Sequence, residues 1–190
     1  MKRTHMPIYS LVVIIFFWVT GIPLASTSSS ADDKSDAALL QAIDQGDTEG
    51  ARRLLKQGAN TNARDAAGRT ALMYAAITGQ TRVVLKALLD RGADVNARSS
   101  DGTTALIAAA TFGDPQAIKM LLSKGAEVNA RDASGETALT RAQQRLSDAP
   151  KDRSLFPNMP EENDFGDFIL CTKDEFEQVV TLLKRAGGTE

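Results

Sequence analysis

Apolar residues recur along this chain in short stripes at helical spacing, separated by turns that contain glycine, asparagine and aspartate. One kind of stripe has small and apolar side chains, at residues 71–76 and 105–110, and follows a threonine that can cap a helix N-terminus. The other kind, as in Ile118, Leu121 and Leu122, places large apolar side chains at i, i+3 and i+4 on one helix face. The pattern predicts an all-α fold of paired helices. Four leucines should be buried between helix layers: Leu88, Leu89, Leu121 and Leu122.

The helix pairs repeat with a period of 33 or 34 residues. Three series of residues show this period: Gly68, Gly102 and Gly135; Gly58, Gly92 and Gly125; Asn62, Asn96 and Asn129. A turn and two helices in each unit of this length predict a stack of similar repeats. The predicted units are about 32–64, 65–98, 99–131 and 132–188.

The first and last units depart from the regular pattern. In the first, a helix is expected from about Asp36 to Gln45, and Asp47 caps the next helix. Terminal repeats are atypical because one face meets water. In the fourth, the first helix continues to Leu146 without a turn glycine, and a polar insertion, residues 147–172, interrupts the repeat. The second helix then resumes at an apolar stripe: Phe176, Val179, Val180 and Leu183.

Residues 65–98 contain a series of motifs that returns in the same order in the following units. The series is Gly-x-Thr-Ala-Leu, a small-residue helix, Gly, an apolar helix, then Gly-Ala-acid-Val-Asn-Ala-Arg. In this order the chain resembles the ankyrin-repeat family, across roughly residues 32–188. The resemblance implies an all-α solenoid of about four helix-loop-helix repeats, the last interrupted by a long loop. One motif differs, because the family's Thr-Pro-Leu-His is here Thr70–Met73, Thr104–Ile107 and Thr137–Thr140. The family histidine bridges loop backbone, so this bonding is either weaker here or made by other groups.

The resemblance also implies a concave surface that binds another protein. By family position, the exposed variable residues are Ala66, Ala67, Arg69, Ile77 and Thr78, then Ser100, Asp101, Thr103, Thr111 and Phe112, then Ala133, Ser134 and Glu136. Most of these side chains are small or weakly polar. Arg69, Ile77 and Phe112 are therefore the expected anchors, and Thr78, Asp101, Thr103 and Glu136 are the other predicted partner-binding residues of this surface.

The insertion is the most individual segment of the chain. Phe165 and Phe168 lie there among six acidic residues: Asp148, Asp152, Glu161, Glu162, Asp164 and Asp167. The two phenylalanines could be anchors for a partner, with the carboxylates as a polar rim. They could equally fold back as a lid, because the last repeat must cover its apolar face. Phe165 and Phe168 are included among the predicted partner-binding residues, and the lid is the alternative.

The N-terminal residues 1–31 predict a secretory signal peptide followed by a Ser-rich linker. Lys2 and Arg3 precede an apolar run from Leu11 to Val19, and small residues suited to cleavage follow. The alternative is an uncleaved anchor, because the apolar segment is nearly long enough to span a bilayer. We expect a periplasmic or secreted protein after cleavage, with an inner-membrane anchored protein as the alternative.

Removal of the leader leaves few groups suited to catalysis. His5, the only histidine, lies in the leader, and the single Cys171 has no histidine to pair with. The remainder has 20 Lys and Arg residues against 24 Asp and Glu, a net charge of −4, which gives no electrostatic footprint for nucleic acid. The acidic insertion lacks the ligand spacing of a calcium loop, and paired-carboxylate catalysis is a minor alternative. No catalytic residue, metal ligand or cofactor is predicted.

Three hypotheses about function follow from these observations. The leading one is a non-catalytic scaffold in the bacterial envelope, or secreted, that binds one protein and protects, assists or inhibits it, as a monomer. The second is a membrane-tethered assembly factor that keeps the leader as its anchor. The third is a hydrolase that uses the acidic insertion.

Overall fold

The protein is described here by a computed structural model covering residues 31–77, 82–148 and 173–189. These residues form eight helices: α2 (Ala31–Asp44), α3 (Thr48–Lys56), α4 (Ala71–Ile77), α5 (Arg82–Asp90), α6 (Ala105–Phe112), α7 (Pro115–Ser123), α8 (Ala138–Asp148) and α9 (Lys173–Arg185). The all-α prediction is therefore confirmed. The predictions for residues 1–30, Thr78, Phe165, Phe168 and Cys171 concern positions outside the described residues, as do those for the other residues of the insertion after Asp148.

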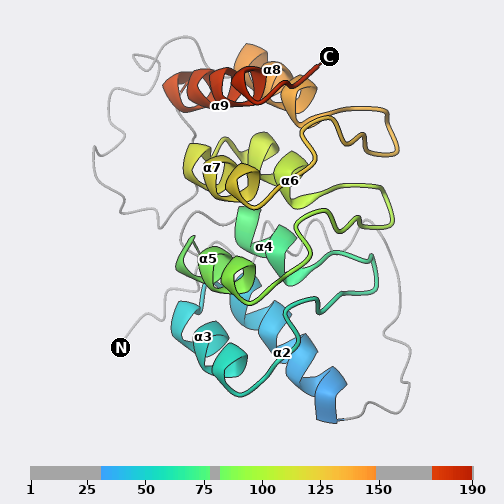
Figure 1. Cartoon of the computed structure of the whole chain (residues 1–190). Coiled ribbons are helices and arrows are strands. Elements are labelled where there is room, and N and C mark those ends of the chain that lie inside the picture. Colours follow the sequence, from blue (N-terminus) through green and yellow to red (C-terminus); the bar gives the residue numbers. More distant parts are fainter. Residues whose placement is uncertain (1–30, 78–81, 149–172, 190) are drawn as a thin grey trace, which may run out of the picture. The chain divides into compact units, whose positions relative to one another are not determined.

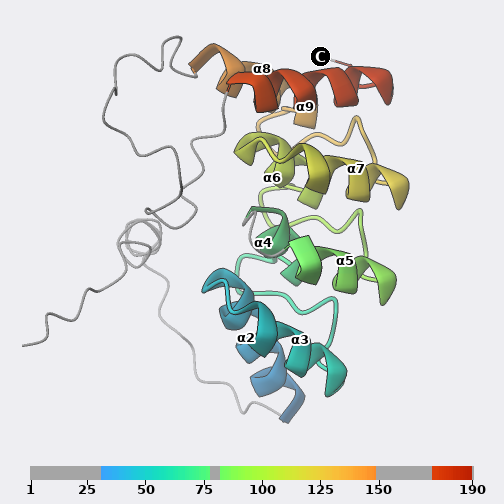
Figure 2. The same ribbon diagram turned by 90° about the vertical axis from the view of Figure 1, so that its left-hand side faces the viewer.

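The helices stack as four pairs in two layers. The first helices of the pairs (α2, α4, α6 and α8) form one layer, and the second helices (α3, α5, α7 and α9) form the other (Figure 2). Each first helix contacts the first helix of the next pair, and each second helix does the same. None of the helices in the described part of the chain has the length and apolar character needed to cross a membrane.

Local sequence explains where several helices begin. Asp47 Oδ1 accepts a hydrogen bond of 2.8 Å from Gly50 N at the start of α3, as its predicted capping role requires. Asp114 caps α7 in the same way, accepting from Gln116 N at 2.8 Å, and Pro115 occupies the first turn. In contrast, α2 begins at Ala31, five residues before the predicted start at Asp36.

The core lies between the two layers and consists mainly of leucine and alanine. All six residues 105–110 of α6 are buried, and the four alanines among them allow the neighbouring first helices to approach closely. Leu88, Leu89 and Leu121 are buried, as predicted. The prediction for Leu122 was wrong, since this side chain is only partly buried at the edge of the core. Consecutive residues point about 100° apart around a helix, and Leu88 and Leu89 are nevertheless both buried, so burial of the second leucine depends on how far the neighbouring helices cover it.

The loops carry two substitutes for the missing family histidine. Met73 Sδ accepts a hydrogen bond from Thr70 N at 3.4 Å, and Thr140 Oγ1 accepts one from Thr137 N at 2.8 Å. The recurrent asparagines also bond between repeats. Asn62 Oδ1 accepts from Asp94 N at 2.8 Å, and Asn96 Oδ1 accepts from Glu127 N at the same distance. These bonds hold successive loops at one spacing.

Candidate functional site

Three loops project from the stack beside the first helices and lie next to one another. They comprise residues 65–69, 99–103 and 132–136, here called the first, second and third loop. Ser100 N donates to Ala67 O at 2.9 Å and Ala133 N donates to Asp101 O at 2.8 Å, so backbone hydrogen bonds join each loop to the next. We call these loops, with the exposed sides of α4, α6 and α8, the loop face. Figure 1 shows the loops projecting on one side of the stack.

A polar cluster lies at the first loop. Asp65 Oδ1 accepts hydrogen bonds from the backbone N–H groups of Ala67 and Arg69, at 2.9 and 2.8 Å. Asp65 Oδ2 accepts from Arg69 Nε at 2.7 Å and from the Tyr74 hydroxyl at 2.8 Å. The Arg69 guanidinium also lies over the Tyr74 ring, 5.1 Å from its centroid, in a cation–π contact. These contacts hold Arg69 and Tyr74 in one arrangement.

The surroundings of this cluster shift the pKa values of its members. Burial would raise the pKa of Asp65, but hydrogen bonds from the Arg69 backbone, the Tyr74 hydroxyl and the Arg69 guanidinium outweigh it and lower the pKa. Burial and the hydrogen bond to Asp65 raise the pKa of Tyr74 well above its ordinary value, so the phenol stays protonated. Asp44, at the end of α2, has a pKa raised by burial and partly offset by the charge of Arg69. The cluster holds charge pairs and a hydrogen-bond donor, with no nucleophile.

A second polar cluster lies at the third loop. Asp132 Oδ1 accepts from Ser134 N at 2.8 Å and from Glu136 N at 3.0 Å, and Asp132 Oδ2 accepts from Arg141 Nη2 at 2.7 Å. Arg141 Nε also lies 2.6 Å from Glu136 Oε2, a charge contact without the alignment of a hydrogen bond. Burial would raise the pKa of Asp132, but the bond from Arg141 and the two backbone N–H groups lower it. Each outer loop therefore holds an arginine against carboxylates.

The middle of the loop face is less polar than its ends. Thr103 and Thr111 are half-buried there, and Ala108 is buried at the position in α6 that Tyr74 and Arg141 occupy in α4 and α8. Phe112, the last residue of α6, is 44% exposed, and Ile77, the last residue of α4, is half-buried. Val83 on α5, in the other layer, is the second exposed large apolar side chain among the described residues. An exposed aromatic ring near small side chains can serve as an anchor for a protein partner.

The repeats of this chain match the family model for ankyrin repeats at residues 39–132 and 84–149, more than half of the sequence. The chain belongs to the ankyrin-repeat family. A search of curated proteins found no match. Ankyrin repeats are protein–protein interaction modules, typically non-catalytic scaffolds, so the ligand class of this ankyrin-repeat protein is another protein.

The ankyrin fold brings most of the predicted partner-binding residues to one surface. Six lie on the loop face: Arg69, Ile77, Asp101, Thr103, Phe112 and Glu136. Arg69 and Glu136 are half-buried in the two polar clusters, which sequence reasoning did not foresee. Asp101 is also bonded, because its Oδ1 accepts from Thr103 N at 3.2 Å and lies beside the Ser99 hydroxyl. Contact of these residues with a partner stays a prediction.

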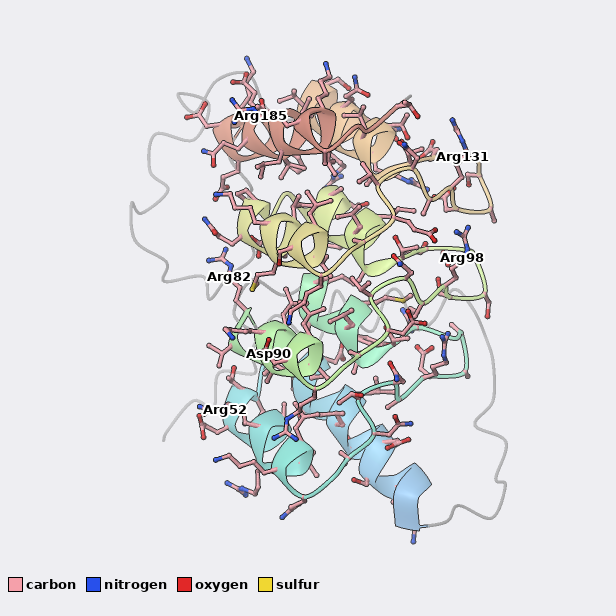
Figure 3. All side chains as sticks on the ribbon, viewed as in Figure 1. Arg52, Arg82, Asp90, Arg98, Arg131 and Arg185 are labelled. Atoms are coloured by element: carbon pink, nitrogen blue, oxygen red, sulfur yellow. The ribbon has the colours of Figure 1, made fainter. Side chains whose placement is uncertain are left out.

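Sequence reasoning assigned no role to a row of arginines on the ankyrin loops. Arg64, Arg98 and Arg131 are exposed and precede the first residue of each loop. Figure 3 shows Arg98 and Arg131 at the projecting loops, away from the helices. Their spacing of 34 and 33 residues was the available signal, since residues that recur with the repeat occupy equivalent places on successive loops. In the described residues, no three His, Cys, Asp or Glu side chains are grouped so as to hold a metal ion.

Proposed function

We propose that this ankyrin-repeat protein is an exported, non-catalytic scaffold, periplasmic or secreted, that binds one partner protein on its loop face. Binding would modulate the partner, by protecting, assisting or inhibiting it. The observation that carries the proposal is that the exposed Phe112 lies on α6, and that the two neighbours of α6, α4 and α8, carry Tyr74 and Arg141 of the two polar clusters.

The polar clusters support this proposal through their rigidity. Arg69 and Arg141 are long side chains that would lose rotamer freedom if a partner had to order them. Their bonds to Asp65 and Asp132, each 2.7 Å, already hold them in the unbound protein. A surface ordered before association loses less conformational entropy on binding, which improves affinity. Phe112 then supplies the apolar contact area.

The chemistry of the same face supports a non-catalytic role. Tyr74 has a raised pKa and serves as a donor to Asp65, so it does not supply a phenolate nucleophile. Asp65 and Asp132 have lowered pKa values and each accept several hydrogen bonds, which makes them weak bases. The leader, with its Lys2 and Arg3 before an apolar run, supports export.

Capture of a partner tests the interaction surface. The full chain is used as bait for envelope extract, together with Phe112→Ala and the control Val83→Ala, which changes the exposed apolar side chain of the second-helix layer. We expect Phe112→Ala to weaken binding of the captured protein at least tenfold, about 1.4 kcal/mol. Val83→Ala should change it less than twofold. Equal losses in the two variants, or none in either, would contradict the assignment to the loop face.

A reporter fusion tests export separately. An enzyme that works only outside the cytoplasm, fused after Glu190, should be active and should lose activity when residues 1–31 are deleted. N-terminal sequencing of the protein from the envelope distinguishes cleavage from retention as an anchor. Activity that survives the deletion would refute export by this leader.

A further inference from the structure

The second helices of the first three repeats carry an excess of cations. Counted from the N-cap to the closing glycine, residues 47–58, 81–92 and 114–125 contain eight Lys and Arg against four Asp and Glu, a charge of +4. The rest of the chain has 14 Lys and Arg against 20 Asp and Glu, a charge of −6, and the two parts give the net charge of −2. The eight cations are Arg52, Arg53, Lys56, Arg82, Lys86, Arg91, Lys119 and Lys124.

These cations lie on the solvent side of α3, α5 and α7 and of the turns that follow them. Arg52 is half-buried and the other seven are exposed, whereas Leu55, Leu88 and Leu121 of the same helices are buried in the core. Figure 3 shows Arg52 and Arg82 at the second helices. Helix α5 contacts both α3 and α7, so the solvent sides of the three helices adjoin one another. We call this surface, with its eight cations, the basic face.

The acids of the same segments are already engaged. Each has a local partner: Glu49 pairs with Arg52, Asp90 with Lys86 and Lys124, and Asp114 with Arg82, while Asp47 caps α3. Four cations form no ion pair within the described residues: Arg53, Lys56, Arg91 and Lys119. Ion pairs between exposed side chains are weak, so they do not hold the other cations away from a stronger anionic ligand. The basic face therefore keeps positive charge for such a ligand.

The side chains among these cations distinguish between kinds of anionic ligand. Protein interfaces are held mainly by tryptophan, tyrosine and arginine in an apolar centre, and surfaces for single-stranded nucleic acid present aromatic rings on which bases stack. The three segments of the basic face contain no Phe, Trp or Tyr. A lipid surface does not need them, because each Lys or Arg near an anionic bilayer adds to the attraction by itself. The composition of the basic face therefore favours lipid headgroups.

The acidic remainder of the chain does not cancel this attraction. At 0.1 M salt the Debye length is about 10 Å, and one helix with its side chains is about 10–12 Å across. The first helices form the other layer of the stack (Figure 2), so their charges are largely screened from a membrane that touches the basic face. The repulsion that remains favours an orientation in which the first helices are turned away from the membrane.

We propose that the basic face docks this protein on an anionic membrane surface, through contacts of its Lys and Arg side chains with lipid headgroup phosphates. This inference goes beyond the proposed function, because it concerns a second surface and a different class of ligand. Docking would leave Phe112, in the first-helix layer, on the side away from the membrane. The scaffold would then present its loop face to a partner protein near the membrane.

Vesicle sedimentation tests the proposal on the full chain. The vesicles contain phosphatidylcholine alone, or phosphatidylcholine with about 40% phosphatidylglycerol, in about 0.05 M salt. We expect about thirtyfold stronger binding to the anionic vesicles, and loss of this preference in about 0.5 M salt. An apolar leader that is retained would bind both kinds of vesicle, so the difference between them isolates the effect of charge.

Substitutions locate the contact. Lys56→Gln with Lys119→Gln removes two cations of the basic face and should reduce the preference for anionic vesicles about tenfold. The matched control is Lys34→Gln with Arg145→Gln, which removes two exposed cations from α2 and α8 in the first-helix layer and should change the preference less than twofold. Lys56→Arg with Lys119→Arg keeps the charge and should keep the binding. Thermal unfolding checks that each variant is folded.

Three results would overturn the proposal. Equal binding of the natural protein to both kinds of vesicle would show that lipid charge is not sensed. Equal losses in the two glutamine variants would show that only the net charge of the chain matters. Displacement from the vesicles by polyglutamate or by a single-stranded oligonucleotide, at the same concentration of anionic groups, would assign the basic face to an acidic protein or to nucleic acid. None of these results alters the capture of a partner through Phe112, so the proposed function is tested separately.

Discussion

The first and second loops have the same backbone shape and different side chains inside it. In the first, Asp65 N donates to Arg69 O at 3.0 Å and Gly68 N donates to Asp65 O at 2.9 Å. In the second, the same two backbone bonds are present: Ser99 N donates to Thr103 O at 3.0 Å, and Gly102 N donates to Ser99 O at 2.9 Å. The carboxylate, however, has moved from the first position of the loop to Asp101.

This difference explains why α6, in the middle of the loop face, carries a small side chain where α4 and α8 carry polar ones. Tyr74 in α4 and Arg141 in α8 reach back to the aspartate that begins their loop. Where Ser99 replaces that aspartate, a polar side chain on α6 would have no carboxylate to bind, and Ala108 stands there. The third loop follows the first, since Asp132 accepts two backbone N–H groups as Asp65 does. The exchange of aspartate for Ser99 at the first position of the loop is therefore accompanied by the exchange of a polar helix residue for Ala108.

The largest test of this comparison removes the side chain that begins a loop. Asp132→Ala should lower the free energy of unfolding by about 3 kcal/mol, because two backbone N–H groups and Arg141 lose their acceptor in a site where the Asp132 side chain is 4% exposed. Ser99→Ala should lower it by only about 1 kcal/mol, because Asp101 still accepts from Thr103 N. Urea unfolding measures both values. Equal losses would show that the two loops do not differ in their dependence on this position.

The glycines test what the loops share. Gly102 and Gly135 both have positive φ, 75° and 78°. A Cβ on Gly102 would lie 3.2 Å from Ala133 N in the next loop, whereas a Cβ on Gly135 would meet nothing within 4 Å. Gly102→Ala should therefore cost about 2–3 kcal/mol, and Gly135→Ala, which carries only the conformational strain, about 1 kcal/mol. Similar values from urea unfolding would mean that the loops do not pack closely.

Acid should weaken the first and third loops through their aspartates. The pKa of Asp132 is held below that of an unfolded chain, so its stabilising contribution is full above about pH 4 and disappears as the pH falls through the folded pKa. Asp132→Asn keeps an acceptor oxygen and cannot titrate. The stability difference between the natural protein and this variant, measured by urea unfolding at pH 7 and pH 3, should shrink at the lower pH. A difference that is constant or grows would refute the lowered pKa.

The smallest expected effect comes from converting one loop into the other. Ser99→Asp together with Asp101→Ala gives the second loop the carboxylate position of the first. Because the backbone bonds and the Gly102 turn are unchanged, stability should stay within about 0.5 kcal/mol of the natural protein. Thermal and urea unfolding measure it. A loss above about 2 kcal/mol would show that the side chains, and not the shared backbone bonds, determine the shape of the second loop.

Much of the fold could be predicted from local signals. The caps Asp47 and Asp114 and the glycines at each turn act within a few residues, so spacing along the chain was enough to find them. The same reasoning was wrong about Leu122, because periodicity gives the face of a helix and not how far a neighbouring helix covers it. For the candidate site, it selected Phe112 correctly as exposed, but it did not foresee that Arg69 and Glu136 are held in polar clusters.

The sequence by itself determined the repeat, its two helices and the positions of its loops, since these depend on backbone conformation and hydrogen bonds within one turn. Only the tertiary structure decided which groups meet across repeats. Asn62 bonds Asp94 N and Arg64 bonds Arg98 O, contacts between residues more than thirty positions apart in the chain. Such bonds exist because stacking of the apolar helices brings successive loops together. Their strength depends on distance and alignment in space, which no single repeat contains.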